Sequence, residues 1–345
     1  MKLFVKIFLF LPLLIMLIAV NYFVDPADLF HYRQNEETIA RFLTIGKPVV
    51  MDLNKFNVRW IKKHYLEKDL VRKNIILGSS RSLEISSNLF HLDSFFNDSV
   101  PIATLEDYLA FYWLQEKNNG LPEKVFIELT PWLLFPNNKL SDNDKLITEY
   151  REMLAHLGID ELSGNGELLK KLKSEYSQLF SLAYFQNSIF KYKGYRSGVE
   201  DNEEEETVMW PDGSVIYGKS FFGQTDTIRA KAVRGIDNSL NLISSQGPEL
   251  FRQDILEKFL EHIRQDGVSV VGFLLPYHPL TYNGLKNTNS NWNIDIAENY
   301  FRDLADQKKI LLIGSYNPDK CRCVEEDFYD GIHTKISGLK KVFSI

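Results

Sequence analysis

Two short motifs in this chain hold the side chains that a serine nucleophile needs. The first is a serine turn, in which Ser79 and Ser80 follow Gly78 at the end of an apolar run. The second is Asp330-Gly-Ile-His333, close to the carboxyl end. A serine hydroxyl becomes a nucleophile when an imidazole takes its proton, and the imidazole needs a carboxylate to orient it. Together the two motifs indicate acyl-transfer chemistry through a covalent serine intermediate.

The spacing of the second motif suits a base and its orienting partner. A separation of three residues lets the Asp330 carboxylate meet the His333 ring within one turn of the chain. The carboxylate then accepts from one ring nitrogen and leaves the other to take the serine proton. The alternative is that Asp330 caps a helix start and that the serine turn is an ordinary βα-loop.

The elements around these motifs alternate between strand and helix patterns. Strands are predicted at Asn74–Leu77, Ser99–Ile102, Lys124–Leu129, Val268–Leu275 and Ile310–Ile313. Helices are predicted at Ser80–Leu89, Leu105–Lys117, Pro248–Gln265 and Ile294–Gln307. This alternation predicts an α/β fold, a doubly wound, flavodoxin-like, parallel five-stranded sheet with helices on both faces. Both motifs then lie on the carboxyl edge of the sheet.

The serine turn joins the first predicted strand to the first predicted helix. Gly78 permits the backbone angles of a tight turn, and Ser79 or Ser80 can cap the helix that follows. Free amides at that helix N-terminus would stabilise an oxyanion beside the serine.

A long segment, residues 136–247, interrupts the alternation between the third and fourth strands. Helical patterns cover Leu140–Leu157 and Glu167–Phe190, and an acidic run covers Asp201–Glu206. We interpret the segment as a helical insertion. Because it follows the third strand, it should cover the serine site and select substrate.

The amino terminus has the pattern of a membrane anchor. Lys2 and Lys6 precede an apolar run at 7–24, with Asp25 and Asp28 after it. The length suffices for one transmembrane helix, and the charges place the amino terminus inside the cytoplasmic membrane and the remainder in the extracytoplasmic or periplasmic space. We therefore expect an anchor at 1–25, a membrane-proximal helical collar at 26–72 and the α/β domain at 73–345.

Composition narrows the classes of partner. The 345 residues are 44% hydrophobic with a formal net charge of -6, and the basic residues are scattered, which argues against a nucleic-acid surface. Cys321 and Cys323 are too few for a four-ligand zinc site. They form either a strained disulfide or, as we expect, two free thiols. No metal and no cofactor are predicted.

At these motifs the chain resembles the SGNH (GDSL-like) hydrolases. The first block of that family places its nucleophile after a strand as Gly-x-Ser, and the last block is Asp-x-x-His. Gly78-Ser79-Ser80 and Asp330-Gly-Ile-His333 match these blocks. The resemblance implies that Ser80 is the nucleophile, His333 the base and Asp330 its orienting partner. Ser79 is the neighbour that a mutation must separate from Ser80.

The chain departs from the family at its two middle blocks. Ala103-Thr104 stands where the family has an oxyanion-hole glycine, and Glu128-Leu-Thr-Pro-Trp132 stands where it has a Gly-x-Asn-Asp asparagine. An oxyanion hole would then use the Ser80 amide, the region of Thr104 and the Thr130 hydroxyl.

A membrane-anchored branch of the family gives the closest resemblance. The chain looks like the extracytoplasmic acyl-transfer proteins that work beside membrane-bound O-acyltransferases, such as the D-alanine-transfer protein of teichoic acid decoration and the alginate acetylation proteins. This resemblance implies transfer or removal of an acyl ester, acetyl by expectation, on a cell-surface polysaccharide, with a membrane-bound O-acyltransferase as a partner.

Several other residues are candidates for substrate contact. Tyr277 and His278 end the fourth predicted strand on the same edge, although two neighbouring prolines suit a simple turn equally well. Arg81 suits an anionic group or an ion pair with Glu128. Two tryptophans, Trp132 and Trp210, suit either sugar stacking or the core.

Two other functions remain open at this stage. The altered middle blocks favour a non-catalytic accessory protein that binds glycan or holds a membrane enzyme. A structural membrane component with a decayed site is a weaker hypothesis, because both end motifs are intact. Convergence of Ser80, His333 and Asp330 is the discriminating observation.

Overall fold

The fold was examined in a computed structural model of the chain. It describes residues 2–24, 34–53, 55–68, 71–135, 146–159, 177–189, 195–198, 206–219, 227–242, 247–288 and 293–344, without the side chains of residues 2–10, 119, 184 and 187–189. Parts of the predicted insertion helices, at 140–145, 167–176 and 190, and most of the acidic run, at 201–205, lie outside the described residues.

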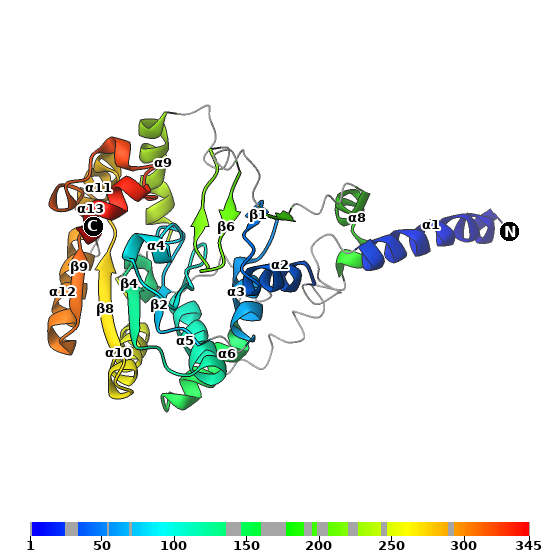
Figure 1. Ribbon diagram of the computed structural model, residues 1–345. Helices are drawn as coiled ribbons and strands as arrows, with labels where there is room; N and C mark the ends of the chain where they lie inside the picture. Colours follow the sequence, from blue (N-terminus) through cyan, green and yellow to red (C-terminus); the bar gives the residue numbers. More distant parts are fainter. Residues whose placement is uncertain are drawn as a thin grey trace.

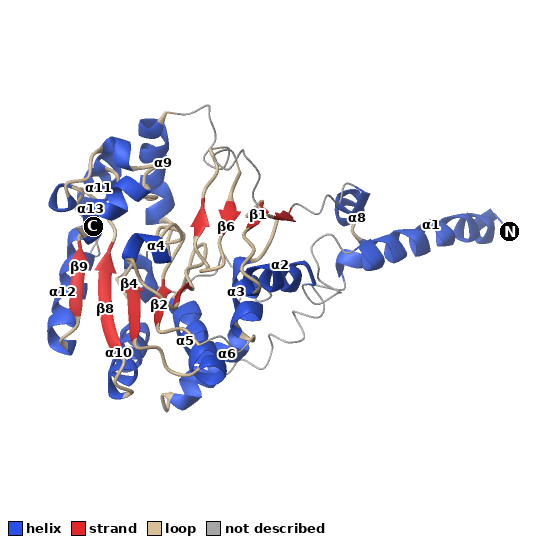
Figure 2. Cartoon of the chain, in the orientation of Figure 1, coloured by secondary structure: helices blue, strands red, loops and turns tan. Residues whose placement is uncertain are grey.

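A five-stranded parallel sheet forms the centre of the α/β domain (Figures 1 and 2). Its strands are β2 (Asn74–Leu77), β3 (Phe95–Asn97), β4 (Lys124–Glu128), β8 (Ser269–Leu274) and β9 (Leu311–Gly314). Their spatial order is β3-β2-β4-β8-β9, with every neighbouring pair parallel. Counted along the chain this is 2-1-3-4-5, the doubly wound order of flavodoxin-like sheets. The predicted α/β class and the parallel five-stranded sheet are confirmed.

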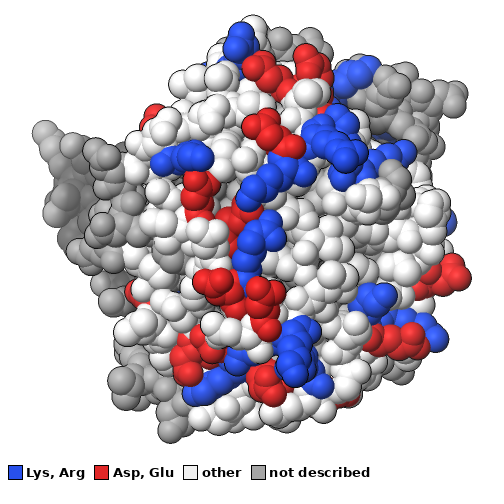
Figure 3. All heavy atoms as spheres, turned by 90° about the vertical axis from the view of Figure 1, so that its left-hand side faces the viewer, with Lys and Arg blue, Asp and Glu red and all other residues white. Residues whose placement is uncertain are grey.

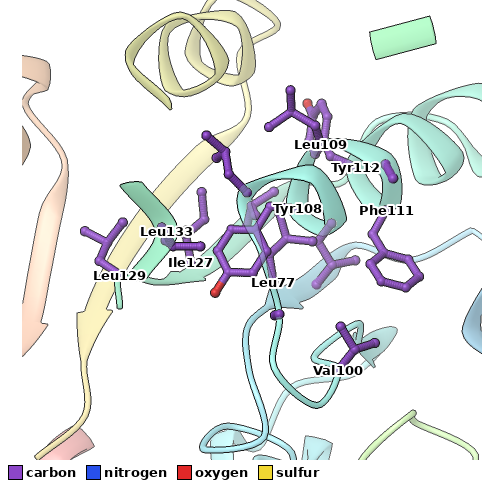
Figure 4. Packing of buried hydrophobic residues seen from close by; sticks show 14 of the residues in the cluster. Leu77, Val100, Tyr108, Leu109, Phe111, Tyr112, Ile127, Leu129 and Leu133 are labelled. Carbon is purple, nitrogen blue, oxygen red and sulfur yellow. The ribbon is translucent and has the colours of Figure 1, made fainter. Parts of the chain in front are cut away.

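Alternation along the strands divides the core between the two faces of the sheet. On β2, Ile75 and Leu77 face one cluster of buried residues and Ile76 faces another. Helices α5 (Leu105–Asn119), α10 (Leu250–Gln265) and α12 (Ile294–Lys308) contribute to the first cluster. Helices α4 (Ser87–Phe90) and α13 (Ile336–Phe343) contribute to the second. Figure 4 shows Tyr108 of α5 packed over Leu77 and Ile127. Both faces are therefore covered, as a parallel sheet requires.

A second, smaller sheet was not predicted. Strands β1 (Val49–Met51), β5 (Tyr195–Ser197), β6 (Val208–Met209) and β7 (Val215–Ile216) pair antiparallel in the order β5-β1-β6-β7. Only β1 comes from the collar, while the other three come from the insertion. The insertion is therefore not purely helical, and it shares a sheet with the segment that precedes the domain.

The remaining elements connect these layers. They are α2 (Gln34–Thr44), α3 (Val58–Leu66), η1 (Pro131–Leu134), α6 (Ile147–His156), η3 (Gln178–Phe180), α8 (Leu182–Ile189), α9 (Ile228–Leu240), α11 (Pro279–Lys286), η4 (Asp319–Cys321) and η5 (Glu325–Asp327).

Helix α3 of the collar is bound to the edge of the main sheet by buried cations. Lys62 Nζ donates to the carbonyls of Asn97, at 2.5 Å, and Ser99, at 2.6 Å. Arg59 donates through Nε to Asp107 Oδ1 at 2.6 Å. Because both side chains are almost fully buried, removing either one would leave unpaired groups in the interior.

Two element predictions were wrong. The second strand lies at Phe95–Asn97 instead of Ser99–Ile102. Pro101 has no amide hydrogen for a ladder, and Ile102 adopts the left-handed region at φ 52°. The predicted helix at Ser80–Leu89 is absent, and the chain there forms turns that lead to the short α4.

Helix α1 (Lys2–Val24) occupies the segment predicted to be the anchor. Asn21 Nδ2 donates to the carbonyls of Gln178, Leu179 and Ser181. Among the described residues, no helix has the length and apolar character needed to cross a membrane, so the anchor is not confirmed.

Charges of both signs share the surface over α12. Figure 3 shows basic and acidic side chains interspersed on this face. Glu298 pairs with Arg302 at 2.7 Å and with Lys320 at 3.2 Å. The charges on this face are thus largely neutralised by their neighbours.

Gly78 is needed for space and not for a left-handed backbone. Its φ is not positive, and a Cβ built on it would lie 2.0 Å from Ser82 Oγ and 2.7 Å from Ser99 Oγ. The absent side chain lets the Ser80 turn fold back onto the ends of β2 and β4.

We predict that Gly78→Ala lowers the free energy of unfolding by about 1–3 kcal/mol, because the added methyl group overpacks the turn. Denaturant unfolding measures the effect. Pairing it with Ser82→Ala, which frees the nearest atom, should cost less than the two single changes combined. Additive costs would contradict the steric explanation.

Candidate active site

The structure brings Ser80, His333 and Asp330 together on the carboxyl edge of the main sheet. His333 Nε2 lies 3.0 Å from Ser80 Oγ, and His333 Nδ1 lies 2.7 Å from Asp330 Oδ2. Ser80 is half-buried, so its hydroxyl remains within reach of a ligand. Groups 253 residues apart in sequence thus form one hydrogen-bonded line. This is the geometry in which a serine is activated as a nucleophile.

Asp330 is held in the ionised state. Its Oδ1 accepts hydrogen bonds from the backbone amides of Ile332 and His333, both at 2.8 Å. Burial alone would raise the pKa of Asp330, but the charge and hydrogen bond of His333, with these two amides, lower it to about 2. An ionised Asp330 favours the proton on Nδ1 of His333. Nε2 is then left with a lone pair facing Ser80.

Glu128 holds the turn that carries Ser80 through hydrogen bonds. This buried carboxylate ends β4, and its Oε2 accepts from the Ser79 amide at 2.7 Å and from Ser82 Oγ at 2.8 Å. The Arg81 amide in turn donates to Ser79 Oγ at 3.2 Å. These bonds fix a tight turn where a helix N-terminus was predicted, so helix-end amides do not supply the oxyanion hole.

Ser79 and Ser80 point to different surroundings. Ser79 is 1% exposed, and its hydroxyl accepts from the Arg81 amide within the turn. Only the Ser80 hydroxyl reaches His333. The geometry therefore separates the two serines as the alignment with the Gly-x-Ser block does.

Three donors were predicted for an oxyanion hole, and their environments differ. The Ser80 amide makes no hydrogen bond to any described residue. Thr104 caps α5, with its amide and its hydroxyl both directed to Asp107 Oδ2, at 2.8 and 3.2 Å. Thr130 is buried at the end of β4, and within the described part of the chain its hydroxyl has no partner. The Ser80 amide and the Thr130 hydroxyl therefore retain free donor capacity.

Arg81 is buried and holds together the backbone around the site. It is 2% exposed and donates to the carbonyls of Leu275, Pro276 and Ile332, at 2.5, 2.9 and 3.1 Å. Its guanidinium also lies 4.3 Å from the centre of the Tyr277 ring and 4.0 Å from the Glu128 carboxylate. Arg81 thus ties the serine turn to the loop after β8 and to the loop that carries His333.

Tyr277 and His278 lie in the loop after β8, and both are buried. Tyr277 is 1% exposed and His278 is 0% exposed. His278 Nδ1 accepts from the Leu280 amide at 3.2 Å, and the His278 amide donates to Gly331 O at 3.0 Å. Burial lowers the pKa of His278, which favours the neutral ring. The backbone amide of His278 thus supports the Asp330–His333 loop, and neither side chain is exposed to a ligand.

The two tryptophans have unequal exposure. Trp132 is 6% exposed, and its Nε1 donates to Ala103 O at 3.1 Å. It therefore packs in the core, while Trp210 is half-buried at the turn between β6 and β7. Cys321 and Cys323 are free, buried thiols, as expected.

A tyrosine that the sequence reasoning missed completes the serine turn. Tyr217, from the insertion, donates through its hydroxyl to the carbonyl of Ser80 at 2.9 Å, and its ring lies 6.0 Å from the His333 ring. Nothing in the local sequence separates Tyr217 from the other 15 tyrosines of the chain. The insertion thus reaches the nucleophile, in agreement with the predicted position of that segment over the site.

Glu84 lies behind Tyr217 and was also missed. It is 3% exposed and accepts from Tyr329 Oη at 2.9 Å and from the Tyr217 amide at 3.4 Å. Burial raises the pKa of Glu84 to about 7, although these two donors and the charge of His333 oppose the shift. Glu84 therefore binds a proton at mildly acidic pH that it would release in the unfolded chain.

Comparison of the chain with protein-family models, with curated proteins and with solved structures gave no match.

The raised pKa of Glu84 predicts that its contribution to the free energy of unfolding changes with pH. Between about pH 4.5 and 7 the folded chain binds more protons at Glu84 than the unfolded chain, so this residue makes stability fall as pH rises. We expect Glu84→Gln to gain roughly 2–3 kcal/mol relative to wild type between pH 5 and pH 8. Denaturant unfolding at both pH values measures the difference. A gap between the two proteins that is the same at both pH values would show that Glu84 titrates normally.

Proposed function

We propose that this protein is a serine esterase or O-acyltransferase that works through Ser80, His333 and Asp330. The single observation that carries the proposal is the continuous line of hydrogen bonds among these side chains, at 3.0 and 2.7 Å. A protein that served only as a scaffold would have no need to hold a half-buried serine against a correctly oriented imidazole.

The proposed reaction has two steps. In the first, Ser80 Oγ attacks the carbonyl carbon of an ester while His333 Nε2 takes the hydroxyl proton. The carbon–oxygen bond to the leaving alcohol breaks, and His333 returns the proton to that alcohol. In the second step, water or another hydroxyl attacks the acyl group on Ser80 while His333 Nε2 takes its proton. The bond from the acyl carbon to Ser80 Oγ breaks, and His333 returns the proton to that oxygen. The acyl group leaves as a free acid or as a new ester.

Charge on the tetrahedral oxygen needs donors near Ser80. We assign this role to the Ser80 amide, which keeps free donor capacity, since the Thr130 hydroxyl is also free among the described residues but is fully buried. The Tyr217 hydroxyl, by holding the Ser80 carbonyl, keeps the serine turn in a fixed orientation. Asp330, ionised down to about pH 2, stabilises the imidazolium that forms in each step.

The proposed fold family is the SGNH type. Support comes from the 2-1-3-4-5 parallel sheet, the position of Ser80 directly after β2, and the position of the Asp330–His333 motif after β9. The Gly-x-Ser and Asp-x-x-His blocks agree with this assignment.

The proposed setting is the outer face of the cytoplasmic membrane. Its support is the sequence pattern of lysines before an apolar run, and the resemblance to extracytoplasmic acyl-transfer proteins. In this proposal the acyl acceptor or donor is a cell-surface polysaccharide, and a membrane-bound O-acyltransferase supplies the acyl group.

A non-catalytic accessory role is the second candidate. The observation that favours it is the absence of the family's glycine and asparagine from the middle blocks, together with the full use of the Thr104 amide by Asp107. Such a protein would bind a glycan or hold its partner enzyme without forming an acyl-serine.

Intact-mass spectrometry of the full chain separates the two candidates. After incubation with an aryl acetate or a fluorophosphonate, we expect one adduct on wild type and none on Ser80→Ala. His333→Ala should label about 10²–10⁴-fold more slowly, since it lacks the base. Ser79→Ala is the matched control and should keep most of the labelling, because it loses one hydrogen bond worth about 1 kcal/mol.

The pattern across these variants decides the outcome. An adduct that survives in Ser80→Ala would refute the assignment of the nucleophile. A folded wild-type protein that forms no adduct with either reagent would favour the accessory role.

A further inference from the structure

A second group of ionisable side chains lies at the opposite edge of the main sheet. Glu116 comes from the last turn of α5, His156 ends α6 and His262 lies in the last turn of α10. Figure 1 shows these three helices together at the lower end of the domain. Because α5 and α10 each end just before the next strand begins, the group lies at the amino edge of the sheet, away from Ser80.

Three atoms of this group converge on one point. His262 Nε2 lies 3.4 Å from Glu116 Oε2, and His156 Nε2 lies 4.0 Å from Glu116 Oε1. One ligand atom from each of the three residues lies within 4.8 Å of the other two. The centres of the two imidazole rings are 5.0 Å apart.

These separations fit the edges of a metal coordination sphere. Ligand atoms about 2.0–2.2 Å from a tetrahedral zinc ion are separated from one another by roughly 3.3–3.6 Å. The 3.4 Å separation agrees with such an edge, and the 4.0 Å separation needs only a small rotation of the half-exposed His156. Imidazole nitrogen and carboxylate oxygen are both ordinary zinc ligands.

Asp266 lies beside His262 but outside the group of three whose ligand atoms are all within 4.8 Å of one another. Asp266 follows α10 directly, and its Oδ2 lies 3.2 Å from His262 Nε2. This oxygen is buried and makes no hydrogen bond to any described residue. One ring nitrogen carries at most one proton, which cannot satisfy Glu116 and Asp266 together. A cation among the three groups would satisfy both carboxylates.

We propose that Glu116, His156 and His262, with Asp266 as fourth ligand, form a structural zinc site. The ion would fasten α6, the first described helix of the insertion, to α5 and α10. Because the site lies at the edge opposite Ser80, it takes no part in acyl transfer, and this inference does not depend on the proposed function. The ligands are spread over 150 residues, and only positions 262 and 266 are close in sequence, so no zinc motif is visible in the sequence.

Zinc retention by the full chain tests the proposal. The protein, carrying no histidine tag, is incubated with excess ZnCl2, passed through gel filtration and analysed for metal. We expect about one zinc ion per chain for wild type and none for His262→Ala. Glu116→Gln, which keeps size and shape, should bind at least about tenfold more weakly in competition with a chromophoric chelator.

His64→Ala is the matched control. His64 also faces a carboxylate, Glu67 Oε2 at 3.1 Å, but belongs to no such three-residue group among the described residues. It should retain zinc as wild type does. Unfolding in EDTA checks that each variant is folded, and zinc should raise the unfolding temperature of wild type but not of His262→Ala.

Either of two results would overturn the site. One is a folded wild-type chain that retains no zinc. The other is equal zinc binding by wild type, Glu116→Gln and His262→Ala, which would place the metal elsewhere. Labelling of Ser80 by the fluorophosphonate should be unchanged in EDTA, so failure of the zinc site is distinguishable from failure of the active site.

Discussion

The active site depends on one buried carboxylate, that of Glu128 at the end of the central strand β4. A fully buried carboxylate is costly unless donors surround it. Here the Ser79 amide and the Ser82 hydroxyl supply two short hydrogen bonds to Oε2, while Oε1 makes no hydrogen bond to a described residue and lies 4.0 Å from Arg81 Nη1. The chain can bring these donors to Glu128 only by turning sharply after β2, and Gly78 leaves the space for that turn. The requirement to satisfy Glu128 therefore fixes the backbone on which Ser80 is presented.

Arg81 links the serine turn to the loop near the carboxyl end that carries His333. Its charge lies near Glu128, while its donors bind carbonyls from the loop after β8 and from Ile332. Because these carbonyls flank the Asp330–His333 loop, the base cannot shift without breaking bonds to a buried guanidinium. The precision of the contact between His333 and Ser80 thus comes from a cation that does not need to touch substrate itself.

The sequence predicted most of the elements that have a periodic apolar pattern, but few of the contacts between residues far apart in the chain. Four of five main strands, the three long helices and the two end motifs were predicted, since apolar alternation and short motifs are local signals. The helix after Ser80 was wrong because Glu128, 48 residues later, pulls the amides of the turn toward itself. Strands of two or three residues, such as β6 and β7, leave no periodic pattern, so the small sheet was missed. Tyr217 follows β7 of that sheet, and Glu84 is tied to the site only by hydrogen bonds from Tyr217 and Tyr329, so no local signal could have placed them there.

The segments outside the main sheet are not separable from it. Lys62 of the collar is buried against the carbonyls of Asn97 and Ser99, and burial lowers its pKa to about 7, opposed by the charges of Asp98 and Asp212. Burial likewise raises the pKa of Asp98 to about 8, opposed by Lys62 and Arg72. Removing the collar would expose the edge strand β3 and leave these groups without their partners.

The same edge receives the turn between β6 and β7, through the bond from the Asn97 amide to Asp212 O. That turn leads directly to Tyr217. The collar and the insertion therefore both support the turn that carries Ser80. We expect a shortened chain that begins at residue 73 to lose this support, because it lacks the collar.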